Sequence, residues 1–218
     1  MQSWAEHFRA GGVFMWPIVV VSVMVLGLVI ERVVTLYFTA AADRAELLNM
    51  LKKLIGAGQI DRAQKALAGN RSPVSKVLLA GLEGYQTSPK VAQMLMDAAA
   101  LTELPRLEAR TGYLAMLSNV ATLTGLLGTI VGLIHSFRAV ADADAATKSA
   151  KLADGISEAM NCTAFGLLVA IPALIMYAVL SSRAHHLADD VHQASIALYN
   201  FLIKAEVPRA DAKTKSVG

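Results

Sequence analysis

Five polar side chains in the second half of the sequence stand in or beside long apolar segments, where they could handle an ion or a proton. They are Ser118, Thr122, Thr129, Glu158 and Thr163. A hydroxyl inside hydrocarbon can hydrate or hydrogen-bond an ionisable group, although it does not itself titrate there. A carboxylate near the membrane surface can exchange protons with water. These residue types therefore favour a proton or ion pathway over bond-breaking chemistry.

The elements that must hold these side chains are three long apolar windows without Asp, Glu, Lys or Arg. They run from Ala10 to Ile30, from Thr111 to Phe137 and from Ala159 to Ser182, which is 21, 27 and 24 residues. Each is long enough to cross about 30 Å of hydrocarbon as a helix. With 55% hydrophobic and 17% charged residues, the composition predicts an all-α, polytopic membrane protein with three transmembrane helices.

Basic residues predict the orientation of these helices. Arg32, the segment between spans one and two, and the C-terminal segment hold 16 Lys and Arg residues, against 4 in the other parts. The richer side is expected to be cytoplasmic. The expected order is a periplasmic N-terminus (1–12), transmembrane helix 1 (13–36), a cytoplasmic helical segment (37–112), transmembrane helix 2 (113–137), a periplasmic loop (138–158), transmembrane helix 3 (159–182), a cytoplasmic helix (183–205) and a disordered tail (206–218). Transmembrane helices 2 and 3 are expected to extend into the cytoplasm. Transmembrane helix 2 would do so through a helix that begins at Pro89 and bends at Pro105.

Small and hydroxylated residues form one stripe on each of the last two spans. At about 100° per residue, each stripe fits within an arc of about 80°. The stripe of span two is Ser118, Thr122, Gly125, Thr129, Gly132 and Ser136, and that of span three is Ala159, Thr163, Gly166, Ala170, Ala173 and Tyr177. Such stripes indicate close helix packing, a polar pathway, or a face that touches a moving partner helix. Glu158 lies about 140° from Thr163 around the helix, and Pro172 predicts a local bend.

No ionisable residue lies in the middle of any span. If the chain works with protons, the titrating acid must therefore come from another subunit. Neither a nucleophile with a base nor a phosphate-binding loop occurs, so an enzyme is not expected, nor is a cofactor or metal. The single cysteine, Cys162, is interpreted as a packing residue, and the His and Asp residues between His185 and His192 as a solvated helix face. The net charge of +3 follows from the topology and does not indicate nucleic-acid binding.

Four motifs carry a resemblance to a known family. They are Ile30-Glu31-Arg32, SPVSKVLLAGLEG (Ser72 to Gly84), GLLGTIVGLIHSF (Gly125 to Phe137) and GISEAMNCTAFGLLVAIPALIMY (Gly155 to Tyr177). In combination they make the chain resemble the MotA/TolQ/ExbB proton-channel family, and most closely its three-span TolQ/ExbB branch. Two positions depart from that pattern: Thr122-Leu123-Thr124 stands where an Ala-Pro pair is frequent, and Ala178 stands where Asn is frequent.

The resemblance implies a stator or channel subunit of a proton-driven motor in the bacterial inner membrane. It implies a homo-oligomer, a five-fold ring around a one-span ExbD/TolR-like partner that supplies a membrane aspartate, and possible work with a TonB/TolA-like protein. Thr129 and Thr163 match the family's pore-facing threonines, and Glu158 its acid at the outer end of span three. Thr122 and Ser118 would also line the proton pathway. The residues that would serve helix packing or partner contact are Gly125, Gly132, Gly166, Ala170, Pro172 and Tyr177.

Several alternatives stay open. A gliding-motility motor of the same family, a passive membrane scaffold and a stand-alone channel are all compatible with the pattern. Hydroxyls would serve Na⁺ as well as H⁺, and the process that is powered is not encoded in these motifs. In the motor hypothesis, we expect the charged partner aspartate to prefer the hydroxyl-lined face and the protonated one to leave it.

Overall fold

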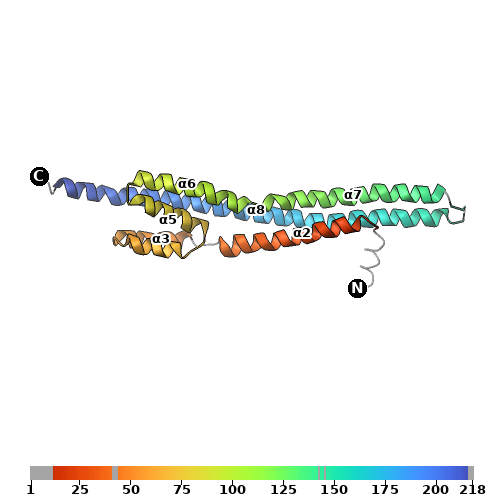
Figure 1. Ribbon diagram of the computed structural model, residues 1–218, viewed down its shortest axis with the longest axis horizontal. Coiled ribbons are helices and arrows are strands. Elements are labelled where there is room, and N and C mark those ends of the chain that lie inside the picture. The colour runs from red at the N-terminus through yellow and green to blue at the C-terminus, as the bar shows by residue number, and fades with distance from the viewer. Residues whose placement is uncertain (1–11, 41–43, 142, 145, 216–218) are drawn as a thin grey trace. The chain divides into compact units, whose positions relative to one another are not determined.

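All regular elements in the described part of the chain are helices. A computed structural model describes residues 12–40, 44–141, 143–144 and 146–215 (Figure 1). Three helical stretches are long and apolar enough to cross a membrane: Met15–Phe38, Pro89–Ala141 and Lys148–Lys204. The predicted all-α fold with three transmembrane helices is thereby confirmed. The chain divides into two compact units, one from Met1–Arg32 and Arg110–Leu180, the other from Val33–Ala109 and Ser181–Gly218.

The first unit contains the apolar helices. They are α2 (Met15–Val33), α7 (Thr111–Ala141) and the first part of α8 (Lys148–Lys215). In this unit α7 and α8 run side by side (Figure 1). They are antiparallel, since Ser118 near the start of α7 contacts Ala170, while Gly132 near its end contacts Ala159. The buried apolar residues of α2 follow a spacing of three and four: Met15, Ile18, Val21 and Val25. One face of α2 therefore packs against protein, and its other faces are exposed.

The helix that begins at Pro89 does not run unbroken into span two, contrary to the prediction. Pro105 lies inside helix α6 (Pro89–Glu108), and the helical dihedral angles end at Glu108. Ala109 is extended at ψ 141°, and Arg110 is left-handed at φ 63°. Alanine and arginine do not predict such a break, because left-handed conformations are most common at Gly, Asn and Asp. The helix is therefore interrupted at Ala109 and Arg110, where the sequence carries no turn signal.

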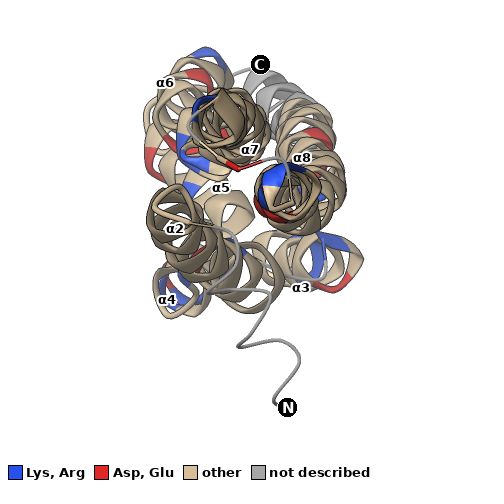
Figure 2. Ribbon diagram, turned by 90° about the vertical axis from the view of Figure 1, so that its right-hand side faces the viewer, with Lys and Arg blue, Asp and Glu red and all other residues tan. Residues whose placement is uncertain are grey.

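Lys, Arg, Asp and Glu residues are coloured in Figure 2, and most of them belong to the second unit. It contains a short π-helix (Val34–Thr39), α3 (Arg44–Gly56), α4 (Ile60–Ala68), α5 (Pro73–Tyr85), α6 and the remainder of α8. Its core consists of Leu51, Ile55, Ala63, Leu67, Val74, Val77, Leu78, Leu82, Ala92, Met96, Ala100, Val191, Ala194, Leu198 and Leu202. These residues come from α3, α4, α5, α6 and α8, so five helices share one apolar centre.

Two serine–proline pairs start helices α5 and α6. Ser72 Oγ accepts a hydrogen bond from Ser75 N at 3.2 Å, and Ser88 Oγ accepts one from Val91 N at 3.2 Å. The proline that follows each serine lacks an N–H, which would have no helical partner at this position. Ser72 and Ser88 are therefore the N-cap residues of α5 and α6.

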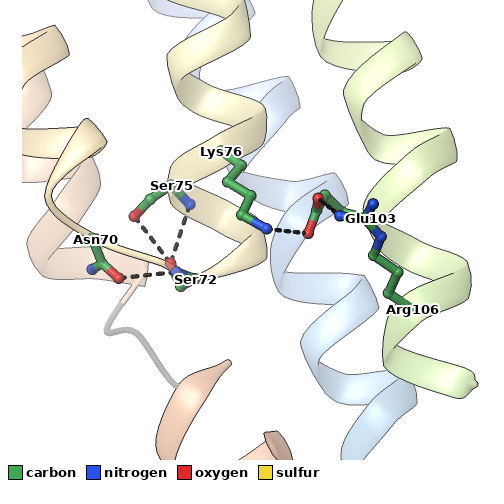
Figure 3. A network of polar contacts seen from close by, with 6 residues as sticks. All are labelled: Asn70, Ser72, Ser75, Lys76, Glu103 and Arg106. Carbon is green, nitrogen blue, oxygen red and sulfur yellow. Dashed lines mark hydrogen bonds and ion pairs between the residues drawn. The ribbon is translucent and has the colours of Figure 1, made fainter.

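A buried carboxylate joins α5 to α6 (Figure 3). Glu103 is only 7% exposed, and it accepts hydrogen bonds from Lys76 Nζ at 2.9 Å and from Arg106 Nη1 at 2.7 Å. Lys76 lies on α5, whereas Glu103 and Arg106 lie on α6. These two partners offset the cost of removing the Glu103 charge from water. The ion pair of Glu103 with Lys76 then fixes how α5 packs against α6.

Helix α8 continues through the residues for which a disordered tail was predicted. The helix extends to Lys215, and residues 216–218 lie outside the described residues, as does most of the predicted periplasmic N-terminus. The predicted membrane helix at 159–182 and cytoplasmic helix at 183–205 are parts of this one element. The predicted periplasmic loop is shorter than expected, because α7 ends at Ala141 and α8 begins at Lys148.

Candidate functional site

The small-residue faces of α7 and α8 lie against each other within one chain. A Cβ added at Gly125 would lie 3.2 Å from Thr163 Cα and 3.3 Å from Gly166 Cα, and one added at Gly132 would lie 3.1 Å from Ala159 Cβ. Such distances are shorter than ordinary van der Waals contacts, so a side chain on either glycine would push α8 away by a few tenths of an ångström. The glycines thus allow the two backbones to approach closely, as small residues do between membrane helices.

Two hydroxyls connect these helices by hydrogen bonds. Ser118 Oγ donates to the carbonyl oxygen of Ala170 at 2.8 Å, and Thr163 Oγ1 donates to that of Gly125 at 3.1 Å. Ser118 is buried, and Thr163 is half-buried. One bond is donated in each direction, so the two helices are held in a fixed register.

Three further hydroxyls of α7 donate to their own helix. Thr122 Oγ1 donates to Ser118 O at 3.1 Å, Thr129 Oγ1 to Leu126 O at 2.6 Å, and Ser136 Oγ to Gly132 O at 2.8 Å. A carbonyl oxygen can only accept, so in every case the hydroxyl proton is committed to the backbone. Each oxygen keeps free lone pairs, so the half-buried hydroxyls of Thr122 and Thr129 can accept hydrogen bonds from groups outside the helix.

Thr122, Thr129 and Thr163 lie along one edge of the α7–α8 pair. Gly125 lies at the centre of the face of α7 that contacts α8. Around the axis of α7, Thr122 and Thr129 lie about 40–60° from Gly125, both in the same direction. Around the axis of α8, Thr163 lies about 60° from Gly166 in the corresponding direction. Because the helices are antiparallel, these rotations bring all three threonines to the same edge, where each is half-buried. Thr163 lies level with Gly125 and hence between the other two, about 5 Å along the axis from each. We name Thr122, Thr163 and Thr129 the threonine edge.

Helix α2 covers the opposite edge of the pair. A Cβ at Gly128 would lie 3.2 Å from Phe14 Cβ and would overlap the Cys162 sulfur. On the same edge, Glu158 lies beside Gly12, where an added Cβ would overlap Glu158 Oε1. Gly12 has φ 69°, which also favours glycine. The structure therefore brings the three threonines together and places Glu158 apart from them, next to the start of α2.

The remaining predicted residues of α8 have differing environments. Gly166 and Ala170 are buried against α7, Tyr177 is half-buried, and Pro172 is exposed. Pro172 removes one backbone donor, yet α8 continues through it as a single helix. A proline whose ring faces away from the packed face does not disturb the contact of α7 with α8.

One group of contacts was missed by sequence reasoning. Glu31 Oε1 accepts hydrogen bonds from Arg110 Nη1 at 2.6 Å and from Arg32 Nη2 at 3.2 Å. The adjacent charges Glu31 and Arg32 at the end of the first apolar window were a visible signal. Nothing in the spacing indicated Arg110, which is 79 residues away.

Metal-binding chemistry has no visible basis in the described ranges. They contain no group of three or more His, Cys, Asp or Glu side chains placed to hold an ion. His185 Nδ1 lies 2.7 Å from Ser181 O of its own helix, and its Nε2 lies 3.8 Å from Glu108 Oε1.

Fold and site together define a multi-pass helical membrane protein in which two closely packed helices expose a line of hydroxyl acceptors. A family model described as the MotA/TolQ/ExbB proton channel family matches residues 69–193, more than half of the sequence. The chain therefore belongs to the MotA/TolQ/ExbB family, a family of channel and transport proteins, as its motifs predict.

Individual relatives agree with this assignment. The chain is 31% identical over 183 residues to a biopolymer transport protein named ExbB-like 1 from Synechocystis, which covers 81% of this chain and 70% of that protein. It is 29% identical over 191 residues to the biopolymer transport protein ExbB of Salmonella typhimurium, covering 79% and 77%. It is 40% identical over 95 residues to the Tol-Pal system protein TolQ of Haemophilus influenzae, covering 44% and 41%.

Proposed function

We propose that the chain is the channel-forming stator subunit of a proton-driven motor in the bacterial inner membrane. In this proposal several copies, in the family's manner a ring of five, surround a one-span ExbD/TolR-like partner. The threonine edge faces that partner. The excess of basic residues supports an orientation with the N-terminus in the periplasm and the C-terminus in the cytoplasm.

The absence of an ionisable group from the centre of the spans supports a partner. None of the three apolar windows contains Asp, Glu, Lys or Arg. Coupling to a proton gradient requires a group that gains and loses a proton inside the membrane, and hydroxyls do not titrate there. The partner would supply a carboxyl group, and this chain would supply the surface on which that group binds and moves.

The hydrogen bonds of the threonine edge favour the neutral form of such a carboxyl group. Thr122, Thr129 and Thr163 each donate to a backbone carbonyl, so each offers an acceptor to a protonated acid. A carboxylate would bind only after a hydroxyl released its carbonyl, at a cost of about 1 kcal/mol. This reverses the preference expected from the sequence: the protonated group would rest on the edge, and the ionised group would leave it for water.

The spacing of the edge supports stepwise movement. Three acceptors about 5 Å apart along the helix axis give a protonated carboxyl group successive resting positions, too far apart to be occupied at once. A membrane potential of about 150 mV supplies roughly 3.5 kcal/mol per proton, several times the thermal energy and enough to bias a step.

Glu158 would serve the outer entrance. It is exposed and lies at the predicted periplasmic end of the third span, beside Gly12. Since it occupies the edge that α2 covers, it does not pass a proton directly to Thr163. Its proposed role is to gather protons at the mouth, from where water carries them to the partner.

The test is Thr163→Val with Thr163→Ser as the matched control, each co-expressed with the one-span partner. Valine keeps the volume and removes the acceptor, whereas serine keeps the acceptor. We expect both variants to assemble with the partner, with proton-dependent work lost in the valine variant and retained in the serine variant. Full activity of Thr163→Val would remove the threonine edge from the pathway.

A passive scaffold is the second candidate, because the hydroxyls of Ser118 and Thr163 visibly join α7 to α8. It predicts that volume-conserving Thr→Val changes are tolerated and that nothing depends on membrane potential. Activity that persists after the potential is collapsed would favour it. A gliding-motility motor of the same family would share the mechanism proposed above and differ in its partner.

A further inference from the structure

An excess of positive charge surrounds one carboxylate where α2 ends and α7 begins. Two guanidinium groups, those of Arg110 and Arg32, donate to the same oxygen, Glu31 Oε1, at 2.6 and 3.2 Å. Two cations therefore share one anion. The first turn of α7 contains no acidic residue, so the positive end of its helix dipole adds to this excess.

Several hydrogen-bond donors in this cluster are unused. Arg32 is 5% exposed, and its Nε and Nη1 atoms have no hydrogen-bond partner among the described residues. The Oγ1 atom of Thr111, next to Arg110, is likewise buried and unpartnered there. Buried donors are almost always satisfied, and a guanidinium group without an acceptor is costly. The cluster therefore lacks an acceptor, and its charge indicates an anionic one.

The lengths of the charge-free apolar windows predict that the cluster lies near the depth of lipid headgroups. The first apolar window ends at Ile30, one residue before Glu31, and α7 enters its apolar window at Thr111. Just inside this boundary, Leu26 and Ile30 on α2 and Tyr113 and Met116 on α7 are exposed apolar side chains. Acyl chains would cover such residues, while the charged end of the same lipid would lie beside Arg110.

We propose that Arg110, Arg32 and Thr111 bind the phosphate group of an anionic phospholipid, in the leaflet on the side where α2 ends. Arg110 provides the entrance, because its side chain is 59% exposed. A phosphate offers several acceptor oxygens and pairs readily with guanidinium groups. After a rotamer change of Arg32, the unpartnered nitrogens of that side chain could donate to the phosphate. This site is independent of the proposed motor function.

The test measures retention of lipid by the purified full-length chain with native mass spectrometry. Phosphatidylglycerol, phosphatidylcholine and inorganic phosphate are the three probes. We expect phosphatidylglycerol to be retained in preference to phosphatidylcholine, and Arg110→Gln to weaken that retention roughly tenfold, as for one lost charge-assisted hydrogen bond. Arg106→Gln, which removes another exposed arginine, is the matched control and should leave retention unchanged.

A second variant keeps the proposal testable should Arg110 matter for folding. Thr111→Val removes a buried hydroxyl that has no partner in the lipid-free chain. We expect this variant to unfold at the same or a higher temperature without lipid, yet to retain phosphatidylglycerol more weakly than the unaltered chain does. Three results would overturn the proposal: unchanged retention in both variants, binding of inorganic phosphate with no lipid preference, or an Arg110→Gln variant that loses self-association but keeps its lipid.

Discussion

The hydroxyl of Thr163 donates its proton to the backbone carbonyl of Gly125, 38 positions earlier in the chain and on a different helix. The bond exists because Gly125 lacks a side chain, so that the backbone of α8 comes close to that of α7. Thr163 consequently serves both of the uses foreseen for a hydroxyl in these spans. It holds two helices together, and its remaining lone pairs are acceptors at the edge of the pair.

Removal of an interhelical hydrogen bond should cost more stability than removal of an intrahelical one. Ser118→Ala deletes the buried donor to Ala170, whereas Thr122→Val deletes a bond within α7. We expect Ser118→Ala to destabilise by about 1 kcal/mol and to lower the unfolding temperature in detergent more than Thr122→Val does. Equal unfolding temperatures for the two variants would contradict the hydrogen-bond assignment of Ser118.

Glycines at the contact of α7 and α8 should not tolerate a methyl group. A Cβ at Gly166 would lie 2.8 Å from Ala121 O, and one at Gly125 would lie 3.2 Å from Thr163 Cα. Gly125→Ala and Gly166→Ala should separate the helices and lower the unfolding temperature. Gly27→Ala is the control, since nothing lies within 4 Å of that position, and alanine favours helices over glycine. If the three variants unfolded alike, the close approach would be refuted.

Gly12 and Glu158 should be energetically coupled. Gly12→Ala introduces a Cβ into the space of the Glu158 carboxylate and strains a residue at φ 69°. In a Glu158→Ala background the overlap disappears and only the backbone strain remains. A double-mutant cycle on unfolding temperature should therefore show a smaller cost of Gly12→Ala in that background. Additive costs would mean that Glu158 does not lie beside Gly12.

The buried carboxylate Glu103 of the second unit gives a prediction independent of the membrane. Glu103→Leu leaves Lys76 and Arg106 without their shared partner, but both are largely exposed and can turn to water. Lys76→Met leaves Glu103 buried, with Arg106 as its one remaining partner. We expect Lys76→Met to be destabilising, by about 1 kcal/mol, and Glu103→Leu to be closer to neutral. Chemical denaturation monitored by circular dichroism would rank them, and the reverse order would contradict this account.

The sequence was sufficient to predict the three apolar helices and the stripes of small residues. Each of these follows from composition or from a spacing within one helix. It was insufficient where the outcome depends on contacts between distant segments. The periodicity placed Thr129 and Thr163 on stripes, but it did not show that their protons are committed to carbonyls. The break at Ala109 and Arg110 was missed because no glycine, proline or asparagine marks it, and the pair of Glu31 with Arg110 joins two helices that no motif connects.

Proton flux into liposomes tests the central claim most directly, which is that this chain supplies acceptors and a partner supplies the acid. The chain would be reconstituted alone and together with its one-span partner, and the interior pH followed after a potential is imposed. Flux or coupled work is expected only with the partner present, and it should be lost in Thr163→Val. Proton flux through the chain alone, at the rate of the complete assembly, would contradict the account.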